Sequence, residues 1–305
     1  MVKRIAVAMS TYNGEKYLTE QIESVLSQSN VDITLFIRDD MSSDKTKILL
    51  ETFRNKVTII DNQKTNLGVG NSFMDLLYAI GSDFDYYAFC DQDDVWLSNK
   101  VESAVEVLTG LSGPQLYCSN QTVVNEQLKP IRTRHNYKIN TSYLQIVNNN
   151  KITGCTMLWN QELQKILIEP SHRPKKELLQ NRIHDVWVSL VASLVGQIHY
   201  DTNSYILYRQ HENNVVGVKK VTILENWKKK LNNKSKRNGR SMIAKEALEK
   251  LPNLISDSEN KKLTLFATYR INIKNKIHLL QNLKLLNGTG ESQIALLIKV
   301  LFNLI

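Results

Sequence analysis

Residues 86–96 read Tyr86-Tyr87-Ala88-Phe89-Cys90-Asp91-Gln92-Asp93-Asp94-Val95-Trp96, an apolar run that ends in three carboxylates. The apolar part is typical of a buried strand, which would place the carboxylates at the carboxyl edge of a sheet. Open α/β folds bind ligands at that edge, and carboxylate oxygens are good ligands for hard divalent cations. The same residues also suit a solvated turn before a helix that continues through residues 99–102, because Asp is a good helix cap. Taken alone, the stretch predicts either a metal and phosphate site or a capping turn.

Strand and helix patterns alternate on both sides of this stretch. Strand patterns cover residues 4–9, 34–38, 57–61, 86–91 and 115–119, and helical patterns cover residues 15–28, 44–53, 70–80 and 99–108. This alternation predicts an α/β fold with a mostly parallel sheet and helices on both faces. After residue 120 the alternation weakens. There we expect strands at 153–159 and 205–209, and helices from 161 and over 184–195.

The composition is that of an ordinary globular protein. Of 305 residues, 42% are hydrophobic and 23% are charged. Cys90, Cys118 and Cys155 are odd in number and lack Cys-x-x-Cys spacing, so we expect neither a disulfide framework nor a zinc site. A reducing, cytoplasmic location follows as the default. The apolar run at residues 5–10 is too short for a signal-peptide core, and no segment approaches the ~20 apolar residues of a membrane span.

The net charge of +9 is concentrated in one stretch. Residues 219–240 hold nine Lys or Arg and one Glu, so they carry most of that charge. A basic run can bind an anionic membrane or form a solvated face. We expect no nucleic-acid partner, because no recognised nucleic-acid module accompanies the run. Beyond residue 219 the pattern is helical and amphipathic to the C-terminus, which predicts helices that either lie on a membrane or dock on the rest of the protein.

Four motifs follow successive elements along the chain. They are Ser10-Thr11-Tyr12-Asn13-Gly14, Arg38-Asp39-Asp40-Met41-Ser42-Ser43-Asp44, Asp91-Gln92-Asp93-Asp94 and His184-Asp185-Val186-Trp187. Their order over residues 3–217 resembles the family 2 glycosyltransferases of the GT-A fold. Together with residues 153–157 and 208–217, it is most similar to bacterial rhamnosyltransferases that build cell-surface polysaccharide. The resemblance implies a GT-A catalytic domain at 1–218, with a nucleotide-sugar half to about residue 120 and an acceptor half at 121–218. A basic, amphipathic helical extension would follow at 219–305.

The resemblance implies a donor site for a nucleotide sugar. It assigns nucleotide binding to Thr11, Tyr12, Asn13, Asp39 and Asp91. Tyr12 would stack on the base, Asp39 would accept the N3–H of a pyrimidine and Asp91 would contact the ribose. It also implies that Mn²⁺ or Mg²⁺ bridges the two phosphates. Asp93 would be a ligand of this metal, and His211 would be either a metal ligand or a contact of the diphosphate.

The resemblance also assigns residues to the reacting centre. Asp185 matches the general base that takes the acceptor proton, although an Asp before an apolar helix is otherwise most often a cap. His184 would tune Asp185 or contact the acceptor, or it is a surface histidine. Gly154 marks either a close backbone approach at the acceptor side or a plain turn. Arg38 and Arg209 are candidate contacts of the diphosphate or acceptor, since guanidinium groups favour phosphate oxygens.

One position departs from the family pattern. Many relatives read Asp-Asp-Gly-Ser where this chain has Met41 between Asp40 and Ser42. A bulky residue therefore replaces a turn glycine. The nucleotide contact through Asp39 is the prediction that depends most on the geometry of this loop.

The motifs together predict an inverting, metal-dependent glycosyltransferase. The expected reaction moves L-rhamnose from dTDP-L-rhamnose to a hydroxyl of a lipid-linked glycan, in cell-wall or capsular polysaccharide synthesis. The enzyme would work as a peripheral protein on the inner face of the plasma membrane. Two alternatives stay open: the same chemistry with a UDP-hexose donor, and a non-catalytic protein that binds nucleotide sugar or membrane. A dinucleotide-binding dehydrogenase is excluded because the first turn lacks Gly-x-Gly-x-x-Gly.

Overall fold

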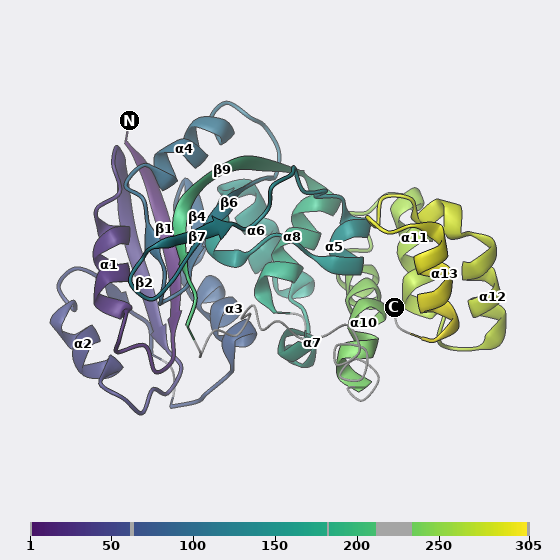
Figure 1. Ribbon diagram of the computed structural model, residues 1–305, viewed down its shortest axis with the longest axis horizontal. Coiled ribbons are helices and arrows are strands. Elements are labelled where there is room, and N and C mark those ends of the chain that lie inside the picture. The colour runs from purple at the N-terminus through teal and green to yellow at the C-terminus, as the bar shows by residue number, and fades with distance from the viewer. Residues whose placement is uncertain (1, 62–63, 182, 212–233, 304–305) are drawn as a thin grey trace.

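The protein is built on one nine-stranded sheet flanked by helices (Figure 1). The computed structural model describes residues 2–61, 64–181, 183–211 and 234–303. The strands are β1 (Lys3–Thr11), β2 (Val31–Asp39), β3 (Thr58–Ile59), β4 (Tyr86–Cys90), β5 (Val95–Trp96), β6 (Gln115–Val124), β7 (Pro130–Thr133), β8 (Met157–Asn160) and β9 (Gln197–Arg209). Their order across the sheet is β3-β2-β1-β4-β8-β6-β9-β5, and β7 pairs with β6. The α/β class expected from the alternating pattern is confirmed.

Helices cover both faces of this sheet. They are α1 (Leu18–Leu26), α2 (Thr46–Thr52), α3 (Val69–Ile80), α4 (Lys100–Leu108), α5 (Tyr143–Asn149), α6 (Gln161–Ile168), α7 (Lys176–Asn181) and α8 (His184–Val195). Short 3₁₀ turns lie at η1 (Gly154–Thr156) and η2 (Pro170–His172). Successive residues of β1 enter opposite cores: Val7 packs with α1, α2 and α4, whereas Ala8 packs with α3, α6 and α8. Because both faces are buried, the parallel strands read as continuous apolar runs.

The second half of the sheet differs from the sequence prediction. The strand expected at residues 205–209 begins at Gln197, and its first half is polar because it borders the sheet there and keeps partly exposed side chains. Residues 154–156, expected as strand, form η1 instead. The segment from residue 121 to about residue 150, for which the sequence predicted only a connection, contains β7 and α5. Helix α5 was hidden because it buries polar side chains, and Asn148 donates to Thr289 O (3.0 Å) at the far end of the chain.

In the described part of the chain beyond residue 233, the helices are α10 (Lys234–Lys250), α11 (Asp257–Thr268), α12 (Ile273–Gln281) and α13 (Gln293–Leu301). The 3₁₀ turn η3 (Leu283–Leu286) lies between the last two. Helix α10 packs against the sheet and its helices, since Glu246 accepts from Lys175 N (2.7 Å) and the apolar side of α10 joins the core of α8. Most of the basic stretch 219–240, and the expected domain boundary at 218, lie outside the described residues. Within the described residues, no helix is both long enough and apolar enough to cross a bilayer.

Met41 occupies a backbone conformation that favours glycine. Its φ is +70°, in the left-handed region where a Cβ costs about 1–2 kcal/mol. We expect Met41→Gly to raise the free energy of unfolding by ~1 kcal/mol, after the extra backbone entropy of glycine is subtracted. Urea unfolding would measure this. Met41→Ala is the control, because it removes the side-chain contacts and keeps the Cβ. Equal changes in the free energy of unfolding in both variants would show that relief of backbone strain does not cause the change in Met41→Gly.

Candidate active site

Parallel register brings the predicted nucleotide residues into one row at the carboxyl edge of the sheet. Thr11 of β1 pairs with Asp39 of β2, and Met9 pairs with Cys90 of β4, so Asp91 follows at the same level. Thr11 Oγ1 donates to Asp39 Oδ1 (3.2 Å). Sequence motifs up to 80 residues apart therefore meet, as expected where parallel strands end together.

Side chains join the loops after β1 and β2 to each other. Asn13 N donates to Ser42 Oγ (2.8 Å), and Ser43 N donates to Asn13 Oδ1 (2.8 Å). Gly14 N donates to Thr46 Oγ1 (2.8 Å). These bonds satisfy the loop amides that no strand or helix pairs. Asn13, predicted to bind nucleotide, is thus also part of the frame that holds this loop.

Asp39 is buried and lines a hollow of about 200 Å³. Its carboxylate accepts from Ser42 N (3.0 Å) and from Ser42 Oγ. The other residues of the hollow are Lys47, Leu50, Glu51, Ile59, Ile60 and Asp61. The bonds to Thr11 and Ser42 fix the position of this carboxylate at the wall of the hollow. The positive φ of Met41 lets the chain turn so that Ser42 reaches Asp39.

Gln92 joins the loop of residues 91–94, called here the acidic loop, to the loop of Tyr12. Its Oε1 accepts from Tyr12 N (2.9 Å), and its Nε2 donates to Tyr12 O (2.9 Å). A Cβ added at Gly14 would lie 2.4 Å from Gln92 Oε1, so glycine makes room for this pairing. The ring of Tyr12 stays 52% exposed. The sequence showed Gln92 inside the motif but no signal for this role, because its partner is a backbone 80 residues away.

The two predicted metal ligands lie together. His211 Nε2 is 2.8 Å from Asp93 Oδ2, and both side chains are largely buried. Adjacent ligands on an octahedral cation with bonds of 2.0–2.1 Å are ~3 Å apart, so this pair has suitable spacing for a shared Mg²⁺ or Mn²⁺. Imidazole and carboxylate also suit Mn²⁺ chemically.

Two further carboxylates and a thiol lie beside this pair. One ligand atom each from Asp91, Asp94 and Cys155 falls within 4.8 Å of the others. Burial, with the charge of Asp93, raises the pKa of Asp91 to about 7 and that of Asp94 well above its ordinary value. Asp94 Oδ1 accepts from Arg209 N (3.0 Å), whereas its buried Oδ2 has no hydrogen-bond partner among the described residues. Such crowding of acids fits a site that gains a cation.

The thiol of Cys155 does not suit a hard cation. Burial and the neighbouring acids raise its pKa well above the ordinary value, so it stays a neutral thiol. Lys100 is a buried cation whose charge acts on Cys155, and its Nζ lies 3.7 Å from the centre of the Trp96 ring. Burial lowers the pKa of Lys100 to about 8. Asp93 and His211 are therefore the better candidates to hold Mn²⁺ or Mg²⁺.

Asp185 lies in the first turn of α8 and is 9% exposed. It borders η1, because a Cβ added at Gly154 would be 3.5 Å from Asp185 Cβ. The next residue, Cys155, faces Asp91. Asp185, the candidate base, and the acidic loop thus lie on either side of Gly154 and Cys155. The fold therefore brings residues 91 and 185 near each other.

His184 is not a surface histidine, because its side chain is buried between aromatic rings. It stacks on Phe73 with centroids 4.0 Å apart and meets Phe89 edge-on at 4.7 Å. Burial lowers its pKa to about 3, so the imidazole is neutral at physiological pH. Neither ring nitrogen has a hydrogen-bond partner among the described residues. His184 is therefore a neutral group packed between Phe73 and Phe89 at the start of α8.

Gly154 supplies the space that His184 needs. A Cβ at this position would lie 2.6 Å from His184 Nε2. We expect Gly154→Ala to cost ~1–3 kcal/mol of stability by overpacking and to lower kcat by displacing Asp185. Thermal unfolding and steady-state kinetics would measure both. In a His184→Ala background the added methyl should cost much less, and equal costs in the two backgrounds would contradict this contact.

The two arginines of the motifs are internal. Arg38 is 1% exposed and donates to Asp40 Oδ1 (2.5 Å) and Asp75 Oδ2 (3.2 Å). Arg209 is 2% exposed, donates from Nε to Asp93 O (3.0 Å) and lies over the ring of Tyr17. Both guanidinium groups hold site loops in place: Arg38 acts through Asp40, and Arg209 acts on the backbone of the acidic loop.

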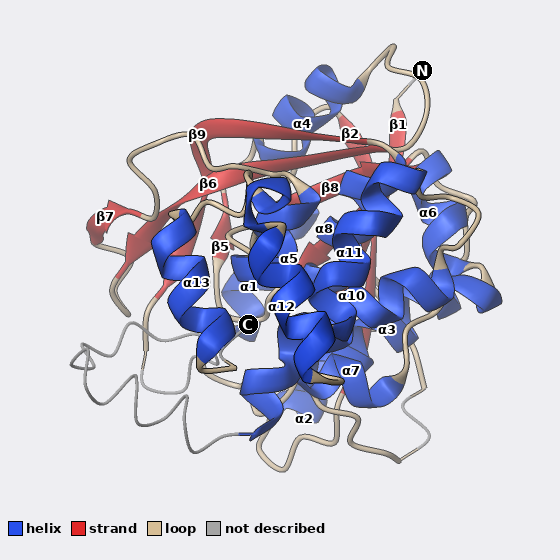
Figure 2. Ribbon diagram, turned by 90° about the vertical axis from the view of Figure 1, so that its right-hand side faces the viewer, coloured by secondary structure: helices blue, strands red, loops and turns tan. Residues whose placement is uncertain are grey.

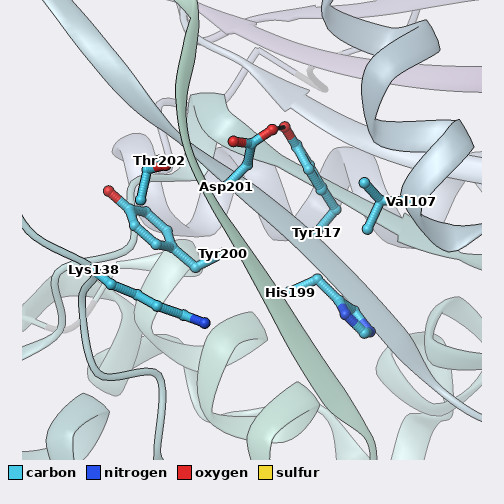
Figure 3. Close-up of a pocket in the computed structure, with 7 residues that line it drawn as sticks. All are labelled: Val107, Tyr117, Lys138, His199, Tyr200, Asp201 and Thr202. Atoms are coloured by element: carbon cyan, nitrogen blue, oxygen red, sulfur yellow. Dashed lines mark hydrogen bonds between the residues drawn. The ribbon is translucent and has the colours of Figure 1, made fainter.

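Another hollow, of about 370 Å³, lies away from these residues (Figure 3). It is lined by Val107, Tyr117, Lys138, His199, Tyr200, Asp201 and Thr202. Tyr117 and Asp201 point toward each other across it, and the Tyr117 hydroxyl donates to Asp201 Oδ2 (3.0 Å). None of the predicted site residues lines this hollow.

Comparisons with known proteins agree with this fold. Residues 6–167, just over half of the chain, match the sequence model of the family described as Glycosyl transferase family 2. The dTDP-rhamnosyl transferase RfbG of Shigella flexneri is 30% identical over 231 residues, covering 68% of this chain and 73% of that protein. The UDP-Glc:alpha-D-GlcNAc-diphosphoundecaprenol beta-1,3-glucosyltransferase WfgD of Escherichia coli is 28% identical over 138 residues, covering 43% of this chain and 53% of its own.

Solved structures share the GT-A fold. Staphylococcus aureus TarS 1-349 in complex with UDP-GlcNAc has a TM-score of 0.61 at 16% identity, and the match covers 98% of this chain and 88% of that one. Mannosyltransferase PcManGT from Pyrobaculum calidifontis, in complex with GDP-Man and Mn²⁺, has a TM-score of 0.52 at 13% identity, covering 98% and 79%. The family match over more than half of the sequence, with the 30% identical relative, shows that the chain belongs to glycosyltransferase family 2.

Proposed function

We propose that the protein transfers L-rhamnose from dTDP-L-rhamnose to a hydroxyl of a lipid-linked glycan, with inversion at the anomeric carbon. The observation that supports the proposal is that η1 lies between two candidate parts of the site: Asp91 and Asp94 lie close to Cys155, and Asp185 lies beside Gly154. In the same loop as Asp91, Asp93 pairs with His211. A metal site and a base are the two parts that this chemistry needs. The donor identity is supported by the 30% identical relative named as a dTDP-rhamnosyl transferase.

The proposed reaction assigns a step to each side of the site. The acceptor hydroxyl oxygen attacks the anomeric carbon while the bond from that carbon to the diphosphate oxygen breaks. Asp185 takes the hydroxyl proton, so the nucleoside diphosphate leaves with the bonding electron pair. A bound Mn²⁺ or Mg²⁺ would supply the positive charge that stabilises this leaving group. Asp93 and His211 would hold the metal, and Asp91 would contact the ribose.

The nucleotide half suits a pyrimidine base. Asp39 offers a carboxylate for the N3–H, and Tyr12 offers an exposed ring for stacking. Leu50, Ile59 and Ile60 add apolar wall to the hollow beside Asp39, which suits the C5 methyl that thymine has and uracil lacks. One methyl group in an apolar pocket is worth ~10-fold or more in selectivity.

The UDP-hexose alternative has its own support. WfgD is named for a UDP-Glc donor and a diphosphoundecaprenol acceptor, and one TarS structure holds UDP-GlcNAc. The WfgD name also supports a lipid-linked acceptor, which would place this enzyme at the cytoplasmic face of the plasma membrane as a peripheral protein.

The test is donor binding and slow donor hydrolysis with dTDP-L-rhamnose, UDP-glucose, UDP-galactose and UDP-N-acetylglucosamine. Each donor would be measured with Mn²⁺, with Mg²⁺ and with chelator. We expect preference for dTDP-L-rhamnose and loss of binding with chelator. Preference for a UDP-sugar would replace the donor and keep the mechanism. If none of the four donors binds, the result would favour the non-catalytic alternative.

A further inference from the structure

The end of the molecule formed by α12 and α13 exposes large apolar side chains. This end lies opposite α2 along the long axis of the protein (Figure 1). Ile294 is 70% exposed, Ile273 67% and Phe302 63%, as exposed as a surface lysine would be. The full set is Ile271, Ile273, Ile277, Ile294, Leu297, Ile298, Leu301 and Phe302, called here the apolar end surface. Contiguous exposed apolar side chains mark a site of interaction rather than ordinary surface.

Helix α13 shows why this surface lacks a partner within the described chain. Leu296 and Val300 face inward and are buried, whereas Ile294, Leu297 and Leu301 recur on the opposite face and are exposed. A helix that is apolar on both faces is typical of one that is covered on both sides. Here the described residues cover one side.

The two helices form one continuous surface. Lys276 Nζ donates to Leu301 O (2.8 Å), and Arg270 donates to Asn303 O, so the start of α12 lies against the end of α13. Ile271, Ile273 and Ile277 therefore lie at the same end of the molecule as Leu301 and Phe302. Figure 2, which faces this end, shows both helices in front of the sheet.

The charge around the surface selects the partner. Residues 269–303 contain five Lys or Arg and one acid, Glu291. Glu291 is already paired with Lys299. Lys274 of α12 and Lys284 of η3 are exposed. A second copy placed on this surface by a twofold axis would bring the same positive charges together, which disfavours self-association. An anionic lipid surface complements both the charge and the apolar side chains.

We propose that α12 and α13 dock the protein on an anionic membrane, with the apolar end surface in the headgroup region and the lysines among the lipid phosphates. The inference extends the proposed function, since a lipid-linked acceptor lies at such a membrane. It does not depend on which donor the enzyme uses, because the surface lies far from the nucleotide hollow between α2 and β3.

The test is co-sedimentation of the full chain with phosphatidylcholine vesicles, with and without phosphatidylglycerol. We expect binding to the anionic vesicles that weakens with salt. Ile294→Glu with Leu301→Glu should lower the binding constant by at least ~10-fold, and Lys274→Gln with Lys284→Gln by a similar factor. Ile48→Glu is the matched control, because Ile48 is 67% exposed on α2 at the other end, and it should bind like the wild type.

Each contrary outcome is distinct. If the wild type fails to bind anionic vesicles, or if the Ile294/Leu301 variant binds equally, the membrane assignment is wrong. A wild-type dimer in light scattering that the same variant dissociates would instead assign the surface to a second copy. Thermal unfolding checks that the variants fold. Donor hydrolysis without vesicles should be unchanged in them, so failure of docking is separable from failure of the proposed reaction.

Discussion

Replacing Asp185 with Asn is expected to lower kcat by ~10²–10⁴-fold while donor affinity stays within about twofold of the wild type. Asn keeps the shape of the side chain at the start of α8 and loses the ability to accept the acceptor proton. The measurements are single-turnover transfer to a glycan acceptor and donor titration by calorimetry. They separate the chemical step from binding.

The capping role of Asp185 makes a different prediction. A carboxylate in the first turn of a helix stabilises the helix dipole by about 0.3–1 kcal/mol. If Asp185 is only a cap, the Asn variant should lose that amount of stability and keep its kcat. Thermal unfolding of the same sample therefore decides between the two roles. His184→Gln provides a comparison for damage to the packing around Asp185, since it perturbs the same turn without removing the carboxylate.

Replacing Asp93 with Ala is expected to lower kcat/KM by ~10³-fold, the loss of several kcal/mol of stabilisation by a metal at the leaving diphosphate. The variant should also make donor affinity insensitive to chelator. His211→Ala should lower the affinity for Mn²⁺ in the same direction, because its imidazole lies 2.8 Å from the same carboxylate. The measurements are titration with Mn²⁺ by paramagnetic relaxation and donor binding with and without metal.

Matched controls sharpen the metal assignment. Asp94 is in the same loop, but its Oδ1 accepts from the backbone of Arg209. We expect Asp94→Asn to retain more Mn²⁺ binding than Asp93→Ala. The opposite order would move the site to the group of Asp91, Asp94 and Cys155. Equal loss of donor affinity in the Asp93 and Asp185 variants would contradict the separate roles of metal ligand and base.

Local pattern was enough for the first half of the fold. The runs that became β1, β2 and β4 are buried on both faces, so their apolar character did not depend on which residues lie opposite. The order of the motifs along these strands then placed Thr11, Asp39 and Asp91 at one edge, because parallel strands end together. The α/β class and family were accessible for the same reason.

Local pattern was not enough to predict elements whose polar residues are bonded by distant segments or exposed at an edge of the sheet. The first half of β9 is polar because it borders the sheet, and α5 is polar because Asn148 bonds to residues 289 and 291. In the sequence nothing distinguishes Gln92 from other polar residues. In the structure its side-chain amide bonds to the backbone of Tyr12. Each depends on a partner that is remote in the chain, so no short window of sequence contains the cause.

The sequence by itself determined the parallel half-sheet, the acidic edge and the family, because burial on both faces and motif order are properties of the chain alone. The tertiary structure decided that Arg38 and Arg209 are buried and bond to loops of the site, and that His184 is a buried, neutral side chain. It also decided which apolar face of α13 is covered and which is open. The physical reason is that the charge state and the exposure of a side chain depend on its neighbours in space. Those neighbours are often distant in the sequence.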